Sequence, residues 1–534
     1  MPSNFTPSSV GIGVEEERGP EQRIARLGTA RSAFVGRTLR GPVNRPILVT
    51  SFTEFQHEFG GLWQPSPLGY AVEQFFDNGG REALIVRVVN GARSATLTLS
   101  AGAANLRLRA LRPGTREYLR ASVDYDNIPA ADTANFNLTV QRVRLQGTAQ
   151  VEDQEIFHEL SMLPRSPSYL PHAIRDSQLF ELAGEMPAQR PDRTLDAASG
   201  LATAYVNSNC DGDDGAPLTD YDVIGNSGDR TGLFALASAD FNFLCIPPLS
   251  RDQDVGAIAM LVGARICKQR RALLIVDPPA VWNTADDALL GMRDWNFSDE
   301  NSVMYFPRVL AHDKLRGHFE SFAPCGAVAG MLARGDEASG VWDPHKGDEA
   351  VLRPGYRPAC LVTEDRRMRL AALGVNTILA GRSAVRIGVS ARTLGKGKAA
   401  HADWQYLTAR RFALFVVNSI ERGTRWVAMA HPHVEVAEMT AAQVRAFFEA
   451  LYEDQAFGAL KMQDAFFVVC DQRSEFQLVI GFAGRAKPGL HTFRITHSPA
   501  GSRVVPVSVN RLNDAHYSPA ELEWVDSLAR SLSE

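Results

Sequence analysis

Asp277 is the side chain whose place in the sequence most resembles that of a reactive group. It directly follows ALLIV, an apolar run that predicts a buried strand, and a similar run, FNFLCI, precedes it within residues 241–279. Between the two runs, Ser250 and Gln253 have the spacing of a capping box that begins a helix. Four apolar residues share one face of this expected helix: Val255, Ile258, Val262 and Ile266.

The order of strand, helix and strand predicts a βαβ unit with parallel strands. Such units often hold ligands at the ends of their strands, which is where Asp277 stands. A soluble α/β enzyme that uses residues 241–279 is therefore one hypothesis for this chain. However, the first strand ends in Pro247-Pro248, whereas a dinucleotide site needs glycines at that point.

Two other motifs resemble ion or phosphate loops but lack required residues. CDGDDG at residues 210–215 begins like a calcium loop, yet Gly215 replaces a ligand and Ala216 replaces the obligatory glycine. LGKGK at residues 394–398 lacks the first glycine of a phosphate loop, and no Ser or Thr follows it. We expect a solvated acidic turn and an exposed basic loop at these places.

Metal and nucleophile signatures are equally incomplete. His431-Pro432-His433 offers two imidazoles, but no further ligand stands at a usable spacing. Residues 225–228 (GNSG) lack the spacing of a hydrolase nucleophile elbow. We therefore predict no catalytic residue, no cofactor and no metal site, and we expect that the protein is not an enzyme.

The composition is that of an ordinary soluble protein. At ~150 residues per domain, 534 residues predict three or four domains. The net charge of -5 shows no basic excess, so nucleic acid is not the expected ligand. The apolar runs are far shorter than the ~20 residues of a membrane-spanning helix, and the N-terminus has no secretory signal. Six scattered cysteines are expected to be mostly buried hydrophobes: Cys210, Cys245, Cys267, Cys325, Cys360 and Cys470.

Residues 33–90 show the clearest local structure. PILVT is an apolar run, and Ser51 with Glu54 forms a capping box that begins a helix ending at Gly60-Gly61. A second expected helix runs to Asn78-Gly79-Gly80, and ALIVRVV then predicts a strand covered on both faces. This order predicts an α/β layer.

The segments FVGRTLRGPVNRPILVTSFTEFQHEFGG and LGYAVEQFFDNGGREALIVRV closely resemble the N-terminal signature of contractile tail sheath proteins. That family forms the outer cylinder of contractile phage tails, R-type bacteriocins and related contractile injection systems. LTDYDVIGNSGDRTGLFAL, FNFLCIPP and RRALLIVDPP are similar to the middle of the family, and CGAVAGMLARGDEASGVWDPHKG with LGVNTI resembles it more loosely.

Between residues 91 and 200 the pattern changes to alternating strands, such as SATLTLS, NLRLRAL and FNLTVQRVRL. The alternation slips by one residue between Val140 and Val143, which predicts a β-bulge. The resemblance implies that this β-rich domain is inserted and lies on the outside of the particle.

The C-terminal part predicts helices and a hairpin. A helix with Tyr406, Ala409, Ala413, Val416 and Ile420 on one face precedes an expected strand at Arg425 to Met429. Thr440 with Gln443 is expected to begin a helix from Thr440 to Leu451. AFFVVCD and FQLVIGFA then predict a hairpin, which two strands alone would leave marginally stable. HTFRITH and VVPVSVN predict further strands, and SPAELEWVDSLARSLSE predicts a terminal helix.

We expect an α/β (mixed α+β) subunit with extended terminal arms. The expected divisions are an N-terminal linking arm (1–22), a discontinuous inner domain (23–90 with 355–486), a β-rich outer domain (91–200), a middle α/β domain (201–354) and a C-terminal arm (487–534).

The resemblance implies that terminal arms add strands to the sheets of neighbouring copies. Val10-Gly11-Ile12-Gly13-Val14 alternates like such an arm, and the donated C-terminal strand is either Phe493 to Thr496 or Val504 to Val509. The residues expected in this strand exchange are Val10, Ile12, Val14, Phe467, Val469, Phe476, Leu478, Ile480, Phe493, Ile495, Val507 and Val509. Arg445, Glu449 and Glu453 form one charged stripe, which either contacts the tube or is simply solvated.

The implied function is that of a structural subunit. The subunit polymerises helically, as stacked hexameric rings, around an inner tail tube protein, and contracts from a metastable extended state to drive the tube through a target envelope. Its implied partners are its own copies, the tube, the baseplate and the tail terminator, without nucleic acid or membrane insertion. Assembly is expected in the bacterial cytoplasm, with release by lysis as part of a virion tail or injection particle.

Overall fold

The computed structural model describes residues 23–507, except for 147, 196–203, 210, 346, 382–384, 388–390, 396–403, 431–433, 459, 472–475 and 486–489. The chain divides into two compact units. Unit 1 comprises Met1–Leu27 with Phe412–Glu534, and unit 2 comprises Gly28–Arg411. Among the described residues, no helix is both long enough and apolar enough to cross a membrane.

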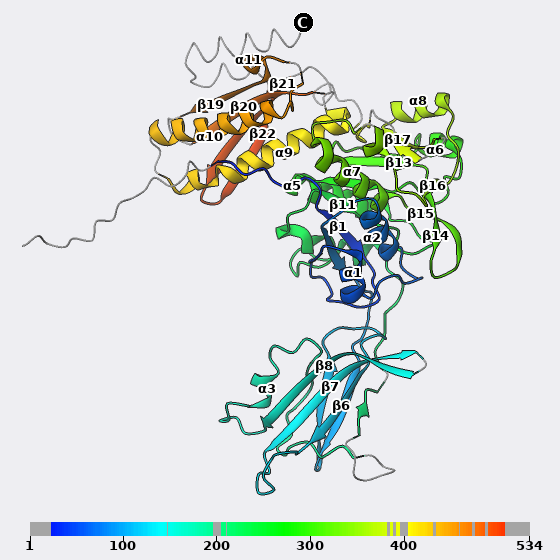
Figure 1. Cartoon of the computed structure of the whole chain (residues 1–534), viewed down its shortest axis with the longest axis vertical. Coiled ribbons are helices and arrows are strands. Elements are labelled where there is room, and N and C mark those ends of the chain that lie inside the picture. Colours follow the sequence, from blue (N-terminus) through cyan, green and yellow to red (C-terminus); the bar gives the residue numbers. More distant parts are fainter. Residues whose placement is uncertain are drawn as a thin grey trace, which may run out of the picture. The chain divides into compact units, whose positions relative to one another are not determined.

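Unit 2 is built on an eight-stranded sheet, and several of its strands are labelled in Figure 1. Its order is β18-β17-β13-β12-β11-β1-β3-β2, and the six inner strands are parallel. The edge strands β2 and β18 are antiparallel to their neighbours. The strands are β1 (Ser32–Gly36), β2 (Ile47–Val49), β3 (Ala83–Arg87), β11 (Phe243–Cys245), β12 (Leu273–Val276), β13 (Ser302–Phe306), β17 (Val375–Ala380) and β18 (Val385–Ile387). The predicted α/β class and the parallel pairing of β11 with β12 are confirmed.

Helices cover both faces of this sheet because its strands are apolar on both sides. On one face, Ala33 and Val35 belong to a core shared with α5, α6 and α8. On the other face, the ring of Phe34 lies 5.5 Å from that of Phe75 in α2. The helical elements of unit 2 up to residue 372 are α1 (Phe52–Phe59), α2 (Leu68–Asp77), α3 (Leu170–Ala173), α4 (Asp220–Ile224), η1 (Gly232–Ser238), α5 (Ala257–Arg270), α6 (Ala285–Gly291), α7 (Cys325–Ser339), η2 (Gly347–Ala350) and α8 (Glu364–Ala372).

The predicted helix start at Ser51 is confirmed, although Glu54 accepts the N–H of Thr50 rather than that of Ser51, so the capping box is only half formed. The helix start predicted at Ser250 is wrong. Ser51 Oγ accepts a hydrogen bond from the backbone N–H of Glu54 at 3.1 Å, and α1 begins at Phe52. In contrast, α5 begins at Ala257 after Gly256, and Ser250 lies in a loop. The expected helical face is also rotated, because Ile258 is 57% exposed while Ala259, Ala264 and Ile266 are buried.

The predicted β-rich part forms two sheets around one core (Figure 1). One sheet has the order β10-β6-β7-β8 and the other β4-β5-β9. Apolar residues of both sheets, such as Leu97, Leu108, Leu138 and Phe180, are buried together. The strands are β4 (Thr96–Ala101), β5 (Ala104–Ala110), β6 (Leu119–Asp124), β7 (Asn135–Gln146), β8 (Thr148–Ser161), β9 (Phe180–Leu182) and β10 (Val206–Asn207).

The predicted β-bulge is confirmed at Arg142 and Val143. Arg142 pairs with Asp153, but the next residue, Val143, pairs with Val151. Glu152 is therefore the extra residue, and it lies on β8 rather than on the strand whose sequence predicted the slip. A further small sheet of unit 2 contains β14 (Val309–Asp313), β15 (His318–Phe322) and β16 (Arg357–Pro358).

Unit 1 combines helices with a four-stranded antiparallel sheet. The order is β19-β20-β21-β22. The elements are α9 (Leu407–Gly423, which begins in unit 2), η4 (Arg425–Met429), α10 (Val434–Glu453), α11 (Met462–Ala465), β19 (Phe466–Asp471), β20 (Gln477–Ala483), β21 (Leu490–Ser498) and β22 (Gly501–Pro506).

Two expectations for unit 1 are wrong. Arg425–Met429 is a 3-10 helix rather than a strand, since it continues directly from the end of α9. Residue Thr440 lies inside α10, where its Oγ1 donates to the carbonyl O of Val436 at 2.7 Å, so the helix begins earlier than predicted. The predicted apolar face of α10 is confirmed by the burial of Val444, Phe447, Phe448 and Leu451.

The sheets also divide the chain differently from the expected domains. Strands from residues 32–87 join those from 243–306 and 375–387 in one sheet, so 23–90 does not group with the C-terminal strands. The break lies at Arg411 and Phe412 rather than near residue 355. Hydrogen bonding between parallel strands that are far apart in sequence produces this grouping, and local patterns do not reveal it.

Candidate functional site

The sheet of unit 1 contains most of the residues predicted to exchange strands. Phe467 and Val469 lie on β19, Leu478 and Ile480 on β20, and Phe493 and Ile495 on β21; all six side chains are buried. Phe476 is half-buried immediately before β20, and Val507 is half-buried after β22. Val10, Ile12, Val14 and Val509 lie outside the described residues, as does the predicted terminal helix.

A layer of aromatic rings covers one face of this sheet. Phe412 of α9 lies 5.5 Å from Phe482 of β20, and Phe448 of α10 stacks on Phe466 of β19 at 4.9 Å between ring centroids. Phe482 also stacks on Phe493 of β21 at 6.0 Å. The core of the sheet is thus formed by the side chains of unit 1 itself.

The two C-terminal segments considered for donation both pair within this chain. Ile495 of β21 lies opposite Leu478 of β20 on one side and Val504 of β22 on the other. The expected two-stranded hairpin is therefore part of a four-stranded sheet. Within the described part of the chain, the outer edges of β19 and β22 pair with no other strand. Unpaired edges present rows of N–H and C=O groups that can accept a further strand.

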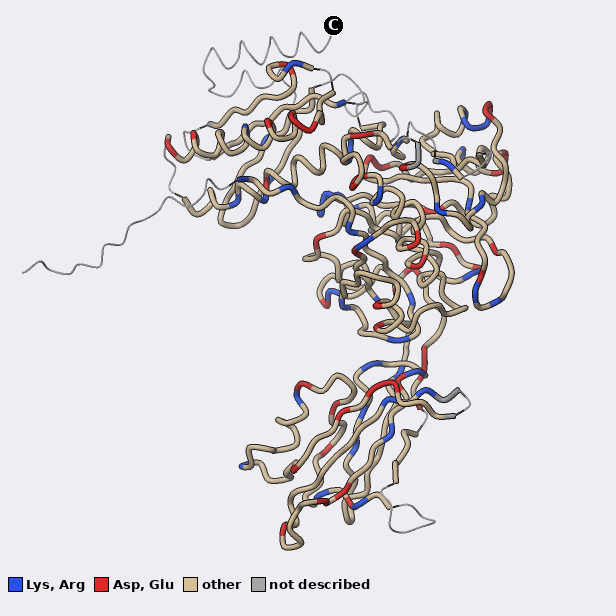
Figure 2. Tube along the Cα trace, viewed as in Figure 1, with Lys and Arg blue, Asp and Glu red and all other residues tan. Residues whose placement is uncertain are grey.

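The charged stripe of α10 lies on its exposed side. Arg445, Glu449 and Glu453 are all exposed, opposite the buried apolar face. Figure 2 shows acidic and basic residues intermixed along the described chain, so the stripe is not part of a field of one sign. This geometry agrees equally with a solvated face and with a contact surface for another protein.

Asp277 is buried at the end of β12. Its Oδ1 accepts a hydrogen bond from the backbone N–H of Cys325, the first residue of α7, at 2.9 Å. Burial raises the pKa of this carboxyl to about 6, although Cys325 and the charge of Arg308 act in the opposite direction. A cavity of about 280 Å³ adjoins it, lined mainly by apolar residues such as Ile246 and Met260. The carboxylate serves as an anchor for the N-terminus of α7.

The acidic turn after residue 210 accepts hydrogen bonds from neighbouring segments of the chain. Asp211 accepts hydrogen bonds from the N–H and hydroxyl of Thr96 at 2.8 and 2.6 Å. Asp214 binds Thr115 in the same way, at 2.9 and 2.8 Å. The turn is therefore structural rather than simply solvated. Among the residues described here, no group of three or more His, Cys, Asp or Glu side chains is placed to hold a metal.

The remaining motifs lie partly outside the described residues. Residues 396–398 of LGKGK and His431-Pro432-His433 lie outside the described residues. In the GNSG segment, Asn226 Oδ1 accepts the N–H of Gly228 at 2.7 Å, which is a local turn. Among the described cysteines, Cys245, Cys267 and Cys325 are buried as expected, whereas Cys360 and Cys470 are half-buried. Cys210 lies outside the described residues.

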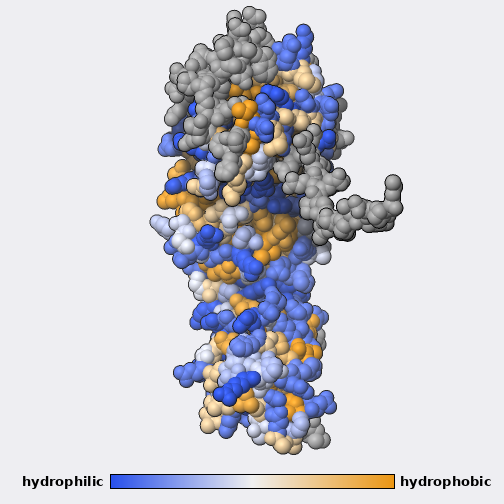
Figure 3. All heavy atoms as spheres, turned by 90° about the vertical axis from the view of Figure 1, so that its left-hand side faces the viewer, coloured by the Kyte–Doolittle hydropathy of each residue, from blue (hydrophilic) through white to orange (hydrophobic). Residues whose placement is uncertain are grey.

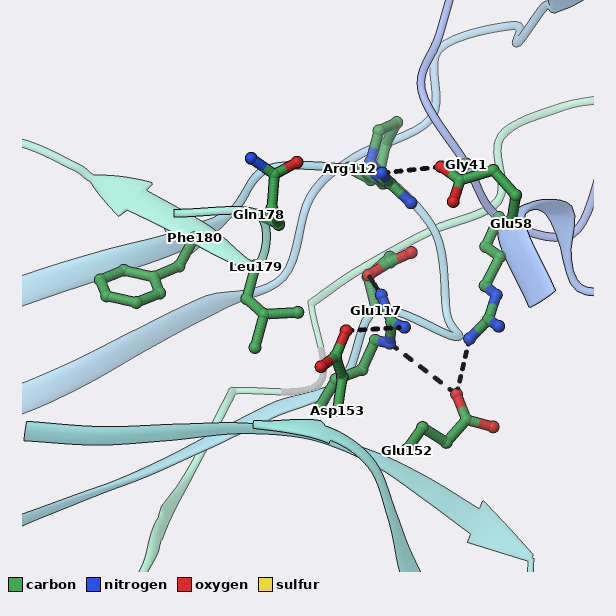
Figure 4. Close-up of polar contacts among 12 residues, drawn as sticks. Gly41, Glu58, Arg112, Glu117, Glu152, Asp153, Gln178, Leu179 and Phe180 are labelled. Atoms are coloured by element: carbon green, nitrogen blue, oxygen red, sulfur yellow. Dashed lines mark hydrogen bonds and ion pairs between the residues drawn. The ribbon is translucent and has the colours of Figure 1, made fainter. Parts of the chain in front are cut away.

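Sequence reasoning missed a buried ionic cluster between the β-rich part and the α/β sheet of unit 2 (Figure 4). Glu152, the bulged residue, lies 2.7 Å from Arg40 and 2.5 Å from Arg144. Burial opposes ionisation, but these guanidinium groups and that of Arg142 lower the pKa of Glu152 below its ordinary value. Nearby, Arg112 pairs with Glu58 at 2.9 Å.

Arg87 extends the connection through hydrogen bonds to backbone carbonyl groups. It is 1% exposed, and its terminal nitrogens donate to the carbonyl O of Gly41 at 2.7 Å and of Pro113 at 2.8 Å. Burial lowers its pKa to about 10. The slipped alternation in the sequence located the bulge, but it gave no signal for these partners from distant segments.

Comparisons with known proteins identify the fold. No protein-family model and no curated protein matches this sequence. Among solved structures, the sheath tail protein Lin1278 from Listeria innocua superposes with a TM-score of 0.62 at 12% identity, over 89% of this chain and 97% of that one. The sheath tail protein DSY3957 from Desulfitobacterium hafniense gives 0.52 at 12% identity, over 93% and 99%.

A third structure, the sheath complex of the extracellular contractile injection system PVC in its contracted state, gives a TM-score of 0.51 at 14% identity. The match covers 90% of this chain and 95% of that one. These structures are described as sheath proteins, and none is described as an enzyme. The chain therefore has the fold of contractile tail sheath proteins, the family that its sequence resembles.

Proposed function

We propose that this protein is the subunit of a contractile tail sheath. Copies polymerise helically around an inner tube in a metastable extended state, and contraction drives the tube through a target envelope. The observation that carries this proposal is the match of nearly the whole chain to three sheath structures, covering 95–99% of each of them.

The C-terminal sheet supplies a means of polymerisation. The outer edges of β19 and β22 carry no strand within the described chain. A segment from a neighbouring copy, such as Val10 to Val14, adds to such an edge through main-chain hydrogen bonds. A contact between two different surfaces of identical subunits does not close on itself, and so it generates an open helix.

Exposed apolar side chains support further contacts between copies. Figure 3 shows hydrophobic atoms among hydrophilic ones on the visible face of the chain. In unit 2, Ile258, Leu261, Val281 and Leu361 are between 57% and 79% exposed. Burying such groups during contraction releases free energy, and even ~1 kcal/mol per subunit becomes large over a polymer when a domain's stability is only 5 to 15 kcal/mol. Contraction then needs no fuel when it is triggered.

The proposed partners follow from this role. They are other copies of the chain, arranged as stacked hexameric rings, the inner tube, the baseplate and the tail terminator. The proposed place of assembly is the bacterial cytoplasm, with release by lysis as part of a virion tail or injection particle.

Deletion of residues 1–20 tests the arm. We expect a folded subunit, because the described cores of both units are formed by residues from Ile24 onward, but no polymer when the variant is mixed with its tube and baseplate. Electron microscopy measures the outcome. Normal sheaths from the truncated chain would show that the N-terminal segment is not a linking arm.

Cross-linking tests the edge itself. Cys470 lies on β19 at the outer side of the sheet order. With Ile12→Cys, oxidation of assembled sheaths should give covalent chains of subunits, and the additional change Cys470→Ser should abolish them. Equal cross-linking in unassembled protein would contradict the proposed exchange between copies.

A further inference from the structure

The side chain of Asp336 in α7 binds the chain beside both points where it passes between the two units. These points are Leu27–Gly28 and Arg411–Phe412. Thr29 Oγ1 donates to Asp336 Oδ2 at 2.6 Å. Arg411 donates to the same carboxylate through both terminal nitrogens, with Nη1 at 2.8 Å from Oδ1. Arg411 Nη2 also donates to the carbonyl O of Thr29 at 3.5 Å.

The carboxylate of Asp336 is buried, and both of its oxygens have hydrogen-bond partners. The side chains of Asp336 and Arg411 are 3% and 5% exposed. His345 Nε2 lies 3.1 Å from Asp336 Oδ1. Burial opposes ionisation, but the charges and hydrogen bonds of Arg411 and His345 hold the pKa of Asp336 below its ordinary value. The carboxylate therefore remains charged, and its bonds are strong because water does not compete for them.

At the first crossing, one residue separates two anchored segments. On the side of unit 1, the N–H of Leu27 donates to Ser419 Oγ of α9 at 3.3 Å, and Arg26 donates to the carbonyl O of Ala450 at 3.0 Å. On the side of unit 2, Thr29 is bound to Asp336. Gly28 lies between them, and a Cβ placed there would meet no atom within 4 Å.

The second crossing lies within α9, whose first turn is fixed in unit 2. Arg410 Nε donates to Asn301 Oδ1 at 2.8 Å, and its Nη2 lies 3.1 Å from Glu300. The next residue, Arg411, holds Asp336. Two consecutive buried arginines thus attach the start of the helix, while its later residues belong to unit 1.

We propose that Asp336 is a positioning residue that fixes both crossings on their unit 2 side. Displacement of unit 1 then begins only at Gly28 and after Arg411, and the segments 29–31 and 407–411 move with unit 2. We call the contacts of Asp336 with Thr29 and Arg411 the clamp. If the protein is a sheath subunit, the clamp holds both connecting segments on unit 2 while unit 1 is displaced during contraction. The clamp itself is a property of the single chain and does not depend on that role.

Limited trypsin digestion and hydrogen exchange of the full-length chain test the proposal. For Asp336→Asn, which removes the charge and keeps the size, we expect cleavage after Arg31 and Arg411 to become about tenfold faster, since local opening governs both measurements. Exchange in 29–31 and 407–411 should rise by a similar factor. The control Asp286→Asn removes an exposed ion pair with Arg366 (2.7 Å) and should change neither.

Two further variants separate the clamp from general stability. Thr29→Val keeps the shape but loses the hydroxyl, so only segment 29–31 should open faster. The pair Asp336→Leu with Arg411→Met leaves no buried charge unpaired, and its fold is checked by circular dichroism. Unchanged exchange in both segments, or an equal rise throughout the strands of unit 2, would overturn the proposal. These measurements use the unassembled chain, so failure of the sheath assignment would leave them unaffected.

Discussion

The guanidinium of Arg142 lies 3.5 Å from the carboxylate of Glu117, and the two side chains are only 5% and 2% exposed. Arg142 also lies 3.8 Å from Glu152 and 3.5 Å from Asp153. The bulge leaves Glu152 outside the regular pairing of β7 and β8, so that its carboxylate joins this cluster. A local irregularity in a ladder thereby places a buried charge network where the β-rich part adjoins the central sheet.

Removing Arg142 should destabilise the β-rich part strongly. Arg142→Met leaves Glu117 and Glu152 buried with fewer counter-charges, and breaking a buried pair in this way typically costs about 3–5 kcal/mol. Hydrogen exchange of the β7 amides measures the loss. As a control, Arg193→Met breaks a pair with Asp126 whose side chains are 45% and 69% exposed. That change should cost less than about 1 kcal/mol, and equal effects of the two substitutions would contradict the role of burial.

Stability should fall between about pH 4 and pH 6 because of Asp277. Its folded-state pKa of about 6 lies above the ordinary 3.8, so the folded chain binds this proton more tightly than the unfolded chain. The resulting stabilisation is fully present below the unfolded pKa and is lost as the pH rises through the folded pKa, a change of about 3 kcal/mol. Asp277→Asn should show a correspondingly shallower fall in urea unfolding over this range. An identical pH profile in the variant would contradict the assignment.

Helices α2 and α7 should not tolerate a methyl group at their contact. A Cβ on Gly326 would lie 1.9 Å from the carbonyl O of Ala71, and one on Gly330 would lie 2.2 Å from that of Phe75. Because backbone atoms cannot yield cheaply, Gly326→Ala should cost about 1–3 kcal/mol or more. Thermal unfolding measures this loss, with Gly28→Ala as the control because no atom lies within 4 Å of the added methyl. Equal melting temperatures would mean that the helices separate freely.

The charged stripe on α10 offers a test of tube binding. Reversing Arg445, Glu449 and Glu453 together should leave the melting temperature of the monomer nearly unchanged, since all three side chains are exposed. If the stripe faces the tube, co-sedimentation with tube protein should weaken at least tenfold, by the ~1.4 kcal/mol that a few lost ionic contacts supply. Undiminished binding would identify the stripe as a solvated face.

Three similar helix-start signatures show how far a local sequence pattern determines the structure. Ser or Thr followed three residues later by Glu or Gln occurs at Ser51, Ser250 and Thr440, but only Ser51 caps a helix. At Ser250 the next residue, Arg251, reaches Asp313 at 2.6 Å, and the chain stays in a loop until Gly256. At Thr440 the helix simply extends backward to Val434. The signature shows that a residue can cap a helix, but tertiary contacts determine whether a helix begins there.

Patterns of burial were predicted better than partners. The apolar faces of α9 and α10 and the buried strands β11 and β12 follow from periodicity alone. The ion pairs do not, because their members are separated widely, as Arg40 is from Glu152 and Asp336 from Arg411. For the same reason, the residues of the C-terminal sheet were predicted, whereas its completion by β21 and β22 within this chain was not.

At one edge of the central sheet of unit 2, β2 has only three residues, whereas the edge strands β19 and β22 of unit 1 each have six described residues. So short a strand is a poor template for an incoming polypeptide, while six residues offer a usable one. If copies of the chain exchange strands, addition at the β2 edge of the large sheet is therefore disfavoured. At a high concentration of newly made chains, association would then occur mainly at the edges of β19 and β22. Ordered polymerisation would be favoured over aggregation.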